Sequence, residues 1–266
     1  MTSCALVVST SKASLPDALN QAIVRIASAA IADHGSFTVA LSGGSAASMM
    51  STLADAFEEH SIDPKFECWH VVLADERCVP VTDPDSNLGS LRSEFLSKTS
   101  IPESQVHGID ESKLASGSQA VAVEYEVQLK RVLEQSKGVL DLAILGFGPD
   151  GHTCSLFPDH PLLEVRDKLV ASIDDSPKPP AERITLTFKV LNEMTRHIIF
   201  CGAGSSKSPI LRKVFASTQQ RESEDKHAHY SVTMTSPPPY PCAMVQPLET
   251  LTWIADRDAV EGVTTE

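Results

Sequence analysis

Apolar and polar positions alternate in a regular way along the first part of the chain. A short apolar run at residues 5–8 has the length of a strand. Apolar residues then recur every three or four positions over residues 15–31, which predicts an amphipathic helix that ends at Gly35. Residues 37–41 form another short apolar run, and helical spacing returns over residues 46–57. The pattern therefore predicts strand, helix, strand, helix.

The same alternation continues toward the carboxyl end and predicts one α/β domain over residues 1–266. Further strands are predicted at residues 69–74, 139–145, 183–188, 196–202, 243–245 and 251–255, and further helices at residues 88–95, 122–133 and 210–215. Residues 217–241 break the alternation, because they are polar and end in a proline-rich stretch. We expect them to form a mobile surface loop.

Net charge limits the partners of this chain. Its 22 Lys and Arg residues face 35 Asp and Glu residues, a formal charge of -13, which argues against nucleic acid and against acidic membrane surfaces. An anionic small molecule would need a pocket with its own cations. No apolar run reaches the length of a membrane span, no secretory signal precedes the first strand, and the six cysteines form no Cys-x-x-Cys pair. These features predict a cytoplasmic protein with free thiols.

The segment 139–158 carries the strongest candidate for chemistry. An apolar strand is followed at once by a glycine-rich loop that contains Asp150 and His152. Open α/β sheets bind ligands at the carboxyl ends of their strands, where this loop is placed. A histidine can exchange protons near neutral pH, so we interpret His152 as a general base with Asp150 beside it.

A second loop, Ser42-Gly43-Gly44-Ser45, joins a predicted strand to a predicted helix. Backbone N–H groups at such a helix start can bind an anion. The glycines are equally compatible with a tight turn that binds nothing.

Charged residues stand at three other element ends. Asp75-Glu76-Arg77 follows a strand, Arg183 begins one, and Lys207 lies near the amino end of a helix. A lysine opposes the helix dipole there, and a bound anion would explain its position. Each of these charges is also compatible with ordinary solvation.

Two motifs are weaker. The segment 146–151 matches the G-x-G-x-x-G pattern of dinucleotide-binding proteins, but prolines follow where that pattern requires a helix, so no nicotinamide or flavin cofactor is expected. His152 with Cys154, and His227 with His229, lack a third ligand at useful spacing, so no metal is expected.

Taken together, the strand-end motifs make the chain resemble the 6-phosphogluconolactonases of the glucosamine-6-phosphate isomerase/6-phosphogluconolactonase family. The matching segments are LSGGS at 41–45, ADERCVP at 74–80 followed by Ser86-Asn87, LGFGPDGHTCSLFP at 145–158, RITLT at 183–187 and GAGSSK at 202–207. They are spread over nearly the whole chain, and DGHTCSLFP is the most specific of them.

The resemblance implies a Rossmann-like, open, mostly parallel sheet with helices on both faces and short extra strands. It implies metal-free and cofactor-free hydrolysis of a phosphorylated sugar lactone, 6-phospho-D-glucono-1,5-lactone, by a protein that we expect to be a monomer. The implied roles are general base for His152, orientation for Asp150 and the sugar end for Asp75 and Arg77. The turn at Gly43, Gly44 and Ser45, together with Arg183 and Lys207, is implied to hold the substrate phosphate, and Asn87 is a further substrate-binding residue.

Two alternatives of the same fold remain. The related sugar-phosphate deaminases carry a Glu five residues after the histidine, where this chain has Phe157, an apolar ring that cannot relay a proton. A non-catalytic sugar-phosphate sensor would need no base in the loop and usually carries a DNA-binding segment, for which we expect no room here.

Overall fold

A mixed sheet forms the centre of the structure. Within residues 3–223 and 225–263, which the computed structural model describes, nine strands lie in the order β10-β11-β1-β12-β9-β6-β2-β3-β5. The pairs from β1 across to β5 are parallel, whereas β11 is antiparallel to both β1 and β10. The strands are β1 (Ser3–Ser9), β2 (Phe37–Leu41), β3 (Trp69–Leu73), β5 (Val106–His107), β6 (Leu140–Gly146), β9 (Thr195–Gly202), β10 (Phe215–Arg221), β11 (Ala228–Met234) and β12 (Thr250–Asp256).

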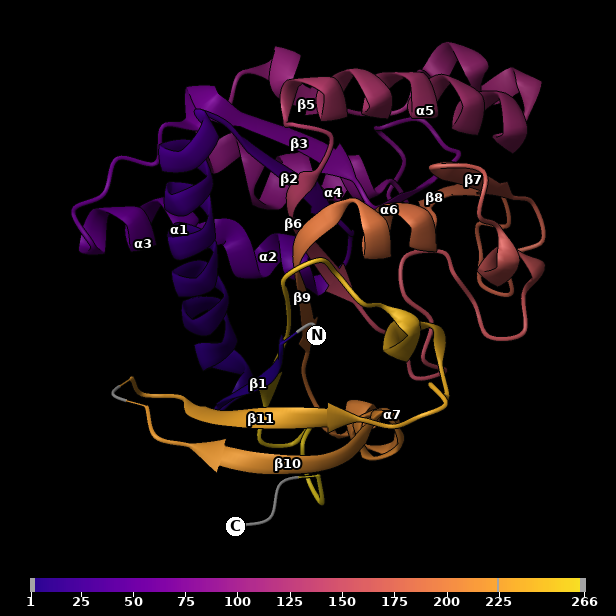
Figure 1. Ribbon diagram of the computed structural model, residues 1–266. Helices are drawn as coiled ribbons and strands as arrows, with labels where there is room; N and C mark the ends of the chain where they lie inside the picture. The colour runs from indigo at the N-terminus through magenta and orange to yellow at the C-terminus, as the bar shows by residue number, and fades with distance from the viewer. Residues whose placement is uncertain (1–2, 224, 264–266) are drawn as a thin grey trace.

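Helices lie on both sides of this sheet (Figure 1). Helices α1, α2 and α3 lie on one side of the central strands, and α6 lies on the other (Figure 1). The helices are α1 (Leu15–His34), α2 (Ser45–Met49), α3 (Leu53–Glu59), α4 (Asn87–Glu94), α5 (Ser118–Gln135), α6 (Phe188–Glu193) and α7 (Ser208–Val214). Short 3₁₀ turns are η1 (Lys12–Ser14), η2 (Met50–Thr52), η3 (Phe66–Cys68), η4 (Leu96–Lys98), η5 (Glu103–Gln105), η6 (Glu111–Ser116), η7 (Pro161–Glu164), η8 (Ser205–Lys207) and η9 (Pro241–Met244). The predicted fold class is confirmed.

The order of the strands reverses between β2 and β6. From β2 the chain moves outward to β3 and β5, and from β6 it moves the other way to β9 and β12. Ligands of open α/β sheets bind outside the carboxyl ends of the strands at such a reversal. The loops after β2 and β6 are therefore the expected walls of a ligand site.

A second, smaller sheet lies beside the main one. Its antiparallel strands, in the order β4-β8-β7, are β4 (Asp75–Arg77), β8 (Arg183–Leu186) and β7 (Val170–Ile173). Helix α5 packs against β7 and β8. Because β4 begins directly after Ala74, this sheet brings Asp75 and Arg77 close to the carboxyl end of β3. The predicted strand at 183–188 stops at Leu186, since α6 begins at Phe188.

Aromatic packing anchors the loop after β6 to the core. Phe147, the first residue of this loop, is buried next to Trp253 of β12, with ring centroids 5.3 Å apart. Trp253 in turn stacks on Phe200 of β9, with ring centroids 4.3 Å apart. A buried aromatic pair contributes about 0.5–1.5 kcal/mol beyond its buried area, so the root of the loop is firmly held.

A buried carboxylate ties the amino end of β6 to its neighbours. Asp141 interrupts the apolar run of this strand and is nearly inaccessible to solvent. Its oxygens accept hydrogen bonds from the Thr38 backbone N–H at 2.8 Å and lie 2.9 Å from His34 Nε2 at the end of α1. The partners offset the cost of burying the charge.

The prediction of a surface loop at residues 217–241 is wrong over much of that range. Strands β10 and β11 form an antiparallel hairpin there, and β11 adds to the sheet along β1. The polar side chains of β10 are mostly exposed, so the hairpin has no continuous apolar face that the pattern would reveal.

Two shorter predictions are also wrong. Residues 243–245 were expected to form a strand, but Pro241–Met244 is a 3₁₀ turn, because proline suits the first turn of a helix. The expected continuous helix over 46–57 is interrupted at η2 by Ser51 and Thr52, which are poor helix formers. The Thr52 hydroxyl also accepts a hydrogen bond from Asn20 of α1.

Candidate active site

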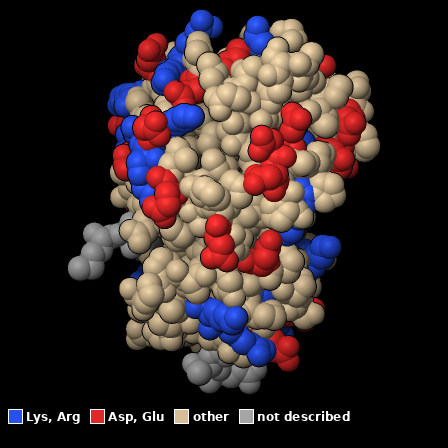
Figure 2. Space-filling model, turned by 90° about the vertical axis from the view of Figure 1, so that its right-hand side faces the viewer, with Lys and Arg blue, Asp and Glu red and all other residues tan. Residues whose placement is uncertain are grey.

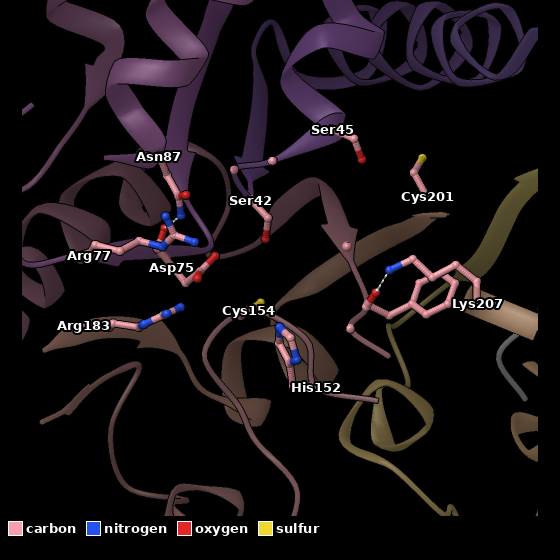
Figure 3. Close-up of a pocket in the computed structure, with 15 residues that line it drawn as sticks. Ser42, Ser45, Asp75, Arg77, Asn87, His152, Cys154, Arg183, Cys201 and Lys207 are labelled. Atoms are coloured by element: carbon pink, nitrogen blue, oxygen red, sulfur yellow. Dashed lines mark hydrogen bonds between the residues drawn. The ribbon is translucent and has the colours of Figure 1, made fainter. Parts of the chain in front are cut away.

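A pocket of about 280 Å³ opens beyond the carboxyl ends of β2, β6 and β9 (Figure 3). It lies at the reversal of strand order, where this class of sheet binds small molecules. Its lining includes these residues that the sequence proposed: Gly43, Gly44, Ser45, Asp75, Arg77, Asn87, His152, Arg183 and Lys207. Asp150 is absent from the lining and lies behind His152, to which it is hydrogen bonded.

The turn between β2 and α2 forms one wall of the pocket. Gly44 has a φ of 77°, a left-handed conformation that favours glycine. Gly43 is required for a different reason, because a Cβ placed on it would lie 1.9 Å from Oδ1 of Asn87. The amide of Asn87 also donates to the backbone oxygen of Asp75 at 2.9 Å. The turn and the start of α4 are therefore packed against each other.

The charged segment after β3 is buried. Asp75 and Glu76 are 6% and 1% exposed, so the alternative of a solvated strand end is wrong for these two residues. Because side chains alternate along a strand, Asp75 and Arg77 both line the pocket while Glu76 points to the opposite side.

Glu76 holds the first turn of α4 and was not predicted as a site residue. Its carboxylate accepts hydrogen bonds from the backbone N–H groups of Asn87 and Leu88, at 2.7 and 2.8 Å. Burial raises the pKa of Glu76, and these backbone hydrogen bonds oppose that rise. A carboxylate at a helix start is a stabilising arrangement, and here it fixes the position of Asn87.

The loop after β6 is tightly shaped around His152. A Cβ on Gly148 would lie 2.1 Å from Nδ1 of His152, so only glycine leaves room for the imidazole. Gly151 has a φ of 81° and lies against the side chain of Tyr240, and the Cys242 N–H donates to the Gly151 oxygen at 3.0 Å. The segment around η9 thus supports the loop from behind.

One nitrogen of His152, Nδ1, lies next to both an anion and a cation. Its Nδ1 lies 2.5 Å from Oδ1 of Asp150 and 3.1 Å from Nζ of Lys178. The same ammonium lies 3.2 Å from Oδ2 of Asp150. Sequence reasoning missed Lys178, because the proline-rich connector that carries it gave no signal beyond irregular structure.

The surroundings of His152 favour its neutral form. Burial lowers the pKa of His152 below its ordinary value; the hydrogen bond and charge of Asp150 raise it, and the charge of Lys178 lowers it again. Burial also raises the pKa of Asp150, but the hydrogen bond and charge of His152, together with Lys178, outweigh burial and bring it to about 2. A carboxylate beside a neutral imidazole is the arrangement that a general base requires.

The guanidinium of Arg183 is hydrogen bonded to the backbone that precedes it. Its Nε donates to the Pro180 oxygen at 2.9 Å, and its Nη2 donates to the oxygens of Lys178 and Pro179 at 2.8 and 2.9 Å. Nη1 lies 3.5 Å from the Ser155 hydroxyl. A guanidinium has five N–H groups, so these contacts, taken over the described residues, leave one N–H of Nη1 for a ligand.

The two guanidiniums of the pocket lie together. Arg183 of β8 pairs in register with Arg77 of β4, and burial followed by the charge of Arg77 lowers the pKa of Arg183. Figure 3 shows both on one side of His152. The Ser155 hydroxyl, which donates to Oδ2 of Asp75 at 3.0 Å, links Arg183 to that carboxylate.

Lys207 lies on the other side of His152, where Ser45 also lies (Figure 3). Its ammonium donates to the Phe147 carbonyl and lies 4.9 Å from the centre of the Phe147 ring. Burial and then the charge of Lys178 lower the pKa of Lys207. The sequence grouped Arg183 with Lys207, whereas the structure separates them to opposite sides of the pocket.

The remaining candidates for chemistry have other partners. Cys154 is buried, and burial raises the pKa of its thiol, which disfavours the thiolate form that a nucleophile requires. His227 lies 2.8 Å from Oδ2 of Asp17, and His229 lies 2.7 Å from Oδ2 of Asp225. In the described residues, no group of three or more His, Cys, Asp or Glu side chains is arranged to hold a metal ion.

The cations of the pocket contrast with the outer surface. On the face shown in Figure 2, acidic side chains gather near the middle, and Lys and Arg side chains lie in separate groups without forming a continuous basic surface. Arg77, Arg183 and Lys207 therefore supply local positive charge to a chain whose formal net charge is -13.

Over the described part of the chain, no helix has both the length and the apolar character needed to cross a bilayer.

Comparison with known proteins identifies the family of this chain. The family model described as glucosamine-6-phosphate isomerases/6-phosphogluconolactonase matches residues 10–253. The chain is 40% identical to the 6-phosphogluconolactonase of Bos taurus over 249 residues, covering 92% of this chain and 88% of that protein. It is 38% identical to the Homo sapiens protein of the same name, with 97% and 93% coverage. The probable 6-phosphogluconolactonase 3, chloroplastic, of Oryza sativa subsp. indica is 36% identical, with 92% and 72% coverage.

Solved structures agree with these relatives. The 6-phosphogluconolactonase of Thermotoga maritima superimposes with a TM-score of 0.75 at 25% identity, covering 97% of this chain and 100% of that one. The enzyme of the same name from Leishmania guyanensis gives a TM-score of 0.74 at 26% identity and covers 98% of both chains.

Proposed function

Because the chain belongs to the glucosamine-6-phosphate isomerase/6-phosphogluconolactonase family, we propose that it hydrolyses 6-phospho-D-glucono-1,5-lactone to 6-phosphogluconate, with His152 as the general base. This makes the chain a carboxylic ester hydrolase of the oxidative pentose phosphate pathway. The observation that carries the proposal is the imidazole of His152, which lines a pocket that also contains cations and is fixed at Nδ1 by Asp150.

The hydrogen bond between Nδ1 and Asp150 determines which ring nitrogen of His152 acts as the base. Asp150 is ionised and accepts the proton of Nδ1, so the lone pair of a neutral His152 is on Nε2. This nitrogen removes a proton from water as the water oxygen attacks the lactone carbonyl carbon. Positioned proton transfer of this kind contributes about 10²–10⁴ in rate.

The proton then returns to the substrate. As the tetrahedral intermediate collapses, the bond to the ring oxygen breaks, and the imidazolium gives its proton to that oxygen. The product is an open-chain acid that releases its own proton to the solvent at neutral pH. Negative charge on the carbonyl oxygen is met by Arg77 or by N–H groups of the loop after β6, since both line the pocket together with His152.

Cations on both sides of His152 suit a phosphorylated substrate. We assign the phosphate to the turn at Gly43, Gly44 and Ser45 together with Lys207, and we assign the sugar to the side of Asp75 and Arg77. A phosphate monoester carries nearly two negative charges at pH 7, so an acidic chain needs such local cations.

Arg183 and Asn87 belong to the side of Arg77 in this arrangement. The free N–H of Arg183 remains a ligand for an anionic or hydroxyl group of the substrate. Asn87, fixed by Glu76 and Asp75, completes the same wall.

The deaminase alternative is disfavoured by Phe157. Its ring lies against the imidazole of His152, with centroids 4.8 Å apart, at the position where the deaminases carry a glutamate. An apolar ring cannot transfer a proton, so ring-opening deamination lacks a relay here.

The test measures hydrolysis of freshly prepared lactone by proton release at pH 6.5, with the uncatalysed rate subtracted. His152→Ala should lose about 10²–10⁴ of the rate and still bind 6-phosphogluconate by calorimetry. The matched control is His229→Ala, a histidine of the hairpin that also pairs with an aspartate. Wild-type turnover by His152→Ala would refute the assignment, and ammonia release from glucosamine 6-phosphate would favour the deaminase.

The cytoplasmic location and the monomeric state remain predictions. One relative is named as chloroplastic, so the location is not general among similar proteins. Size-exclusion chromatography with light scattering would test the monomer.

A further inference from the structure

Lys178 lies on the connector between β7 and β8 and reaches across to the loop after β6. Its ammonium is 3.2 Å from Oδ2 and 3.3 Å from Oδ1 of Asp150, and 3.1 Å from Nδ1 of His152. Like Asp150, Lys178 is not among the residues that line the pocket, whereas His152 is.

Of Asp150, His152 and Lys178, only His152 has a nitrogen, Nε2, that is left to act as a base toward the pocket. Nδ1–H of His152 and the ammonium of Lys178 are both donors, and the acceptor that they share is the carboxylate of Asp150. Asp150 alone would favour a protonated imidazole. With Lys178 beside it, the carboxylate is already paired, and a second positive charge on the imidazole would face the ammonium at about 3 Å.

We propose that Lys178 is a positioning residue for the hydrolysis, which holds the Asp150–His152 pair so that His152 presents an unprotonated Nε2 to the pocket. This inference rests on the proposed function of His152 and adds a role for a residue that does not contact the substrate.

The connector that carries Lys178 is built to hold it in place. Arg183 donates to the oxygens of Lys178, Pro179 and Pro180, and the Ser176 hydroxyl donates to the Lys178 oxygen at 2.8 Å. A buried guanidinium thus fixes the backbone from which the lysine side chain extends. Arg183 therefore connects the side of the pocket that we assign to the sugar with the proposed base.

The other groups that face His152 do not replace Lys178. Among the described residues, the largest charge effects on the imidazole come from Asp150 of the β6 loop, Lys178 of the connector and Asp75 of β4. The cations Arg77, Arg183 and Lys207 line the same pocket as the imidazole. The ring of Phe157 faces the imidazole from the same loop and carries no charge. Among the described cations, Lys178 is the one that is hydrogen bonded to Asp150 and lies 3.1 Å from Nδ1 of His152, so the pocket cations do not take its place beside this pair.

The experiment compares Lys178→Met and Lys178→Arg with the wild type by two readouts. The first is the midpoint of the acid limb of kcat/KM between pH 5.5 and 8. The second is an NMR titration of the His152 imidazole in the resting protein, assigned with His152→Ala. Lys168→Met is the matched control, because Lys168 is an exposed lysine that precedes β7.

For Lys178→Met we expect both midpoints to rise by about one pH unit, since a unit charge at this distance and partial exposure has an effect of that order. The value of kcat/KM should fall about three- to tenfold at pH 6 and less than about twofold at pH 8. Lys178→Arg should restore the midpoint, and Lys168→Met should match the wild type. If Lys178→Met does not fold, Lys178→Gln takes its place.

An unchanged titration midpoint of His152 in both neutral variants would overturn the inference, as would an equal shift in Lys168→Met. Weaker binding of 6-phosphogluconate without a change in midpoint would also overturn it, because Lys178 would then be a ligand. The NMR titration needs no turnover, so it tests Lys178 even if His152→Ala retains activity and the proposed function fails.

Discussion

The imidazole of His152 lies against the ring of Phe157, with centroids 4.8 Å apart and ring planes inclined by 31°. Phe157 is only 1% exposed, and its other neighbours include the guanidinium of Arg183, 5.8 Å from the ring centre. The ring therefore restricts the rotation of the imidazole about its side-chain bonds while Asp150 fixes one of its nitrogens.

Phe157→Leu should reduce kcat about three- to tenfold with little change in KM, since it removes a ring contact of about 0.5–1.5 kcal/mol that orients the base. Steady-state kinetics at pH 7 would measure this. Phe95→Leu, at another fully buried phenylalanine after α4, should lower stability without lowering kcat. Equal kcat values for the two variants would show that Phe157 does not orient His152.

Gly148→Ala should reduce kcat by at least about tenfold, because a methyl group there would lie 2.1 Å from Nδ1 of His152 and displace the imidazole. The loss should appear in kcat more than in the affinity for 6-phosphogluconate. Gly146 also lines the pocket, but no protein atom lies within 4 Å of a Cβ placed on it, so Gly146→Ala should leave the imidazole in place and reduce kcat less. A Gly148→Ala enzyme as active as Gly146→Ala would contradict the loop geometry.

Arg183→Ala should raise KM and lower kcat together. KM rises because the free N–H of Nη1 is lost. The value of kcat falls because the oxygens of residues 178–180 lose the guanidinium as a donor, which loosens the backbone that carries Lys178. Compared with Arg183→Ala, Arg183→Lys should lower KM part of the way toward the wild-type value and raise kcat little. An ammonium cannot donate to all of these oxygens in the same geometry. A lower kcat with an unchanged KM would mean that Arg183 does not bind the substrate.

Lys207→Met should discriminate between lactones with and without a phosphate. We expect kcat/KM for 6-phospho-D-glucono-1,5-lactone to fall about 10- to 100-fold, the value of one charge-assisted hydrogen bond, while hydrolysis of D-glucono-1,5-lactone changes little. Lys137→Met, at an exposed lysine that pairs with Asp33, is the remote control. Equal losses for both lactones would place the phosphate away from Lys207.

The stability of the fold should fall in mild acid because of His107. Burial, followed by the charge of His70, lowers the pKa of His107 to about 4, compared with 6.5 in the unfolded chain. The unfolded chain therefore binds a proton more readily between these values, so the stabilisation is present above pH 6.5 and is lost as the pH falls toward 4.

Since His107 is partly exposed, this loss should amount to about 1–2 kcal/mol, measured by urea unfolding at pH 7.5, 6 and 5. His107→Gln should flatten the pH dependence, whereas His60→Gln, at an exposed histidine, should not. Identical slopes in the two variants would exclude His107 as the source.

Hydrophobic periodicity predicted the central elements because they are buried in a regular way. Strand β2 is buried at every position, and α1 has one apolar stripe and ends at Gly35 in the left-handed conformation, as its sequence indicates. The loop with Asp150 and His152 was placed correctly because parallel strands must end at the same edge. The strand end and the residue types were sufficient to single out this loop, and its chemical role stays a prediction.

Other parts of the site depend on contacts that no local pattern contains. Lys178 follows β7 by several residues and meets Asp150 only because Arg183 folds the connector back. Asp75 and Glu76 looked like solvated charges because the small sheet and α4 that bury them come from elsewhere in the sequence. The separation of Arg183 from Lys207 likewise follows from the arrangement of two sheets.

The support of the loop after β6 by Tyr240 and Cys242 has a consequence for biosynthesis. A ribosome makes the segment with His152 well before it makes the segment that holds Gly151 in place. A nascent chain therefore carries His152 on an unsupported loop until translation has passed Cys242. We expect premature termination upstream of this point to yield inactive fragments even where the central strands have already formed.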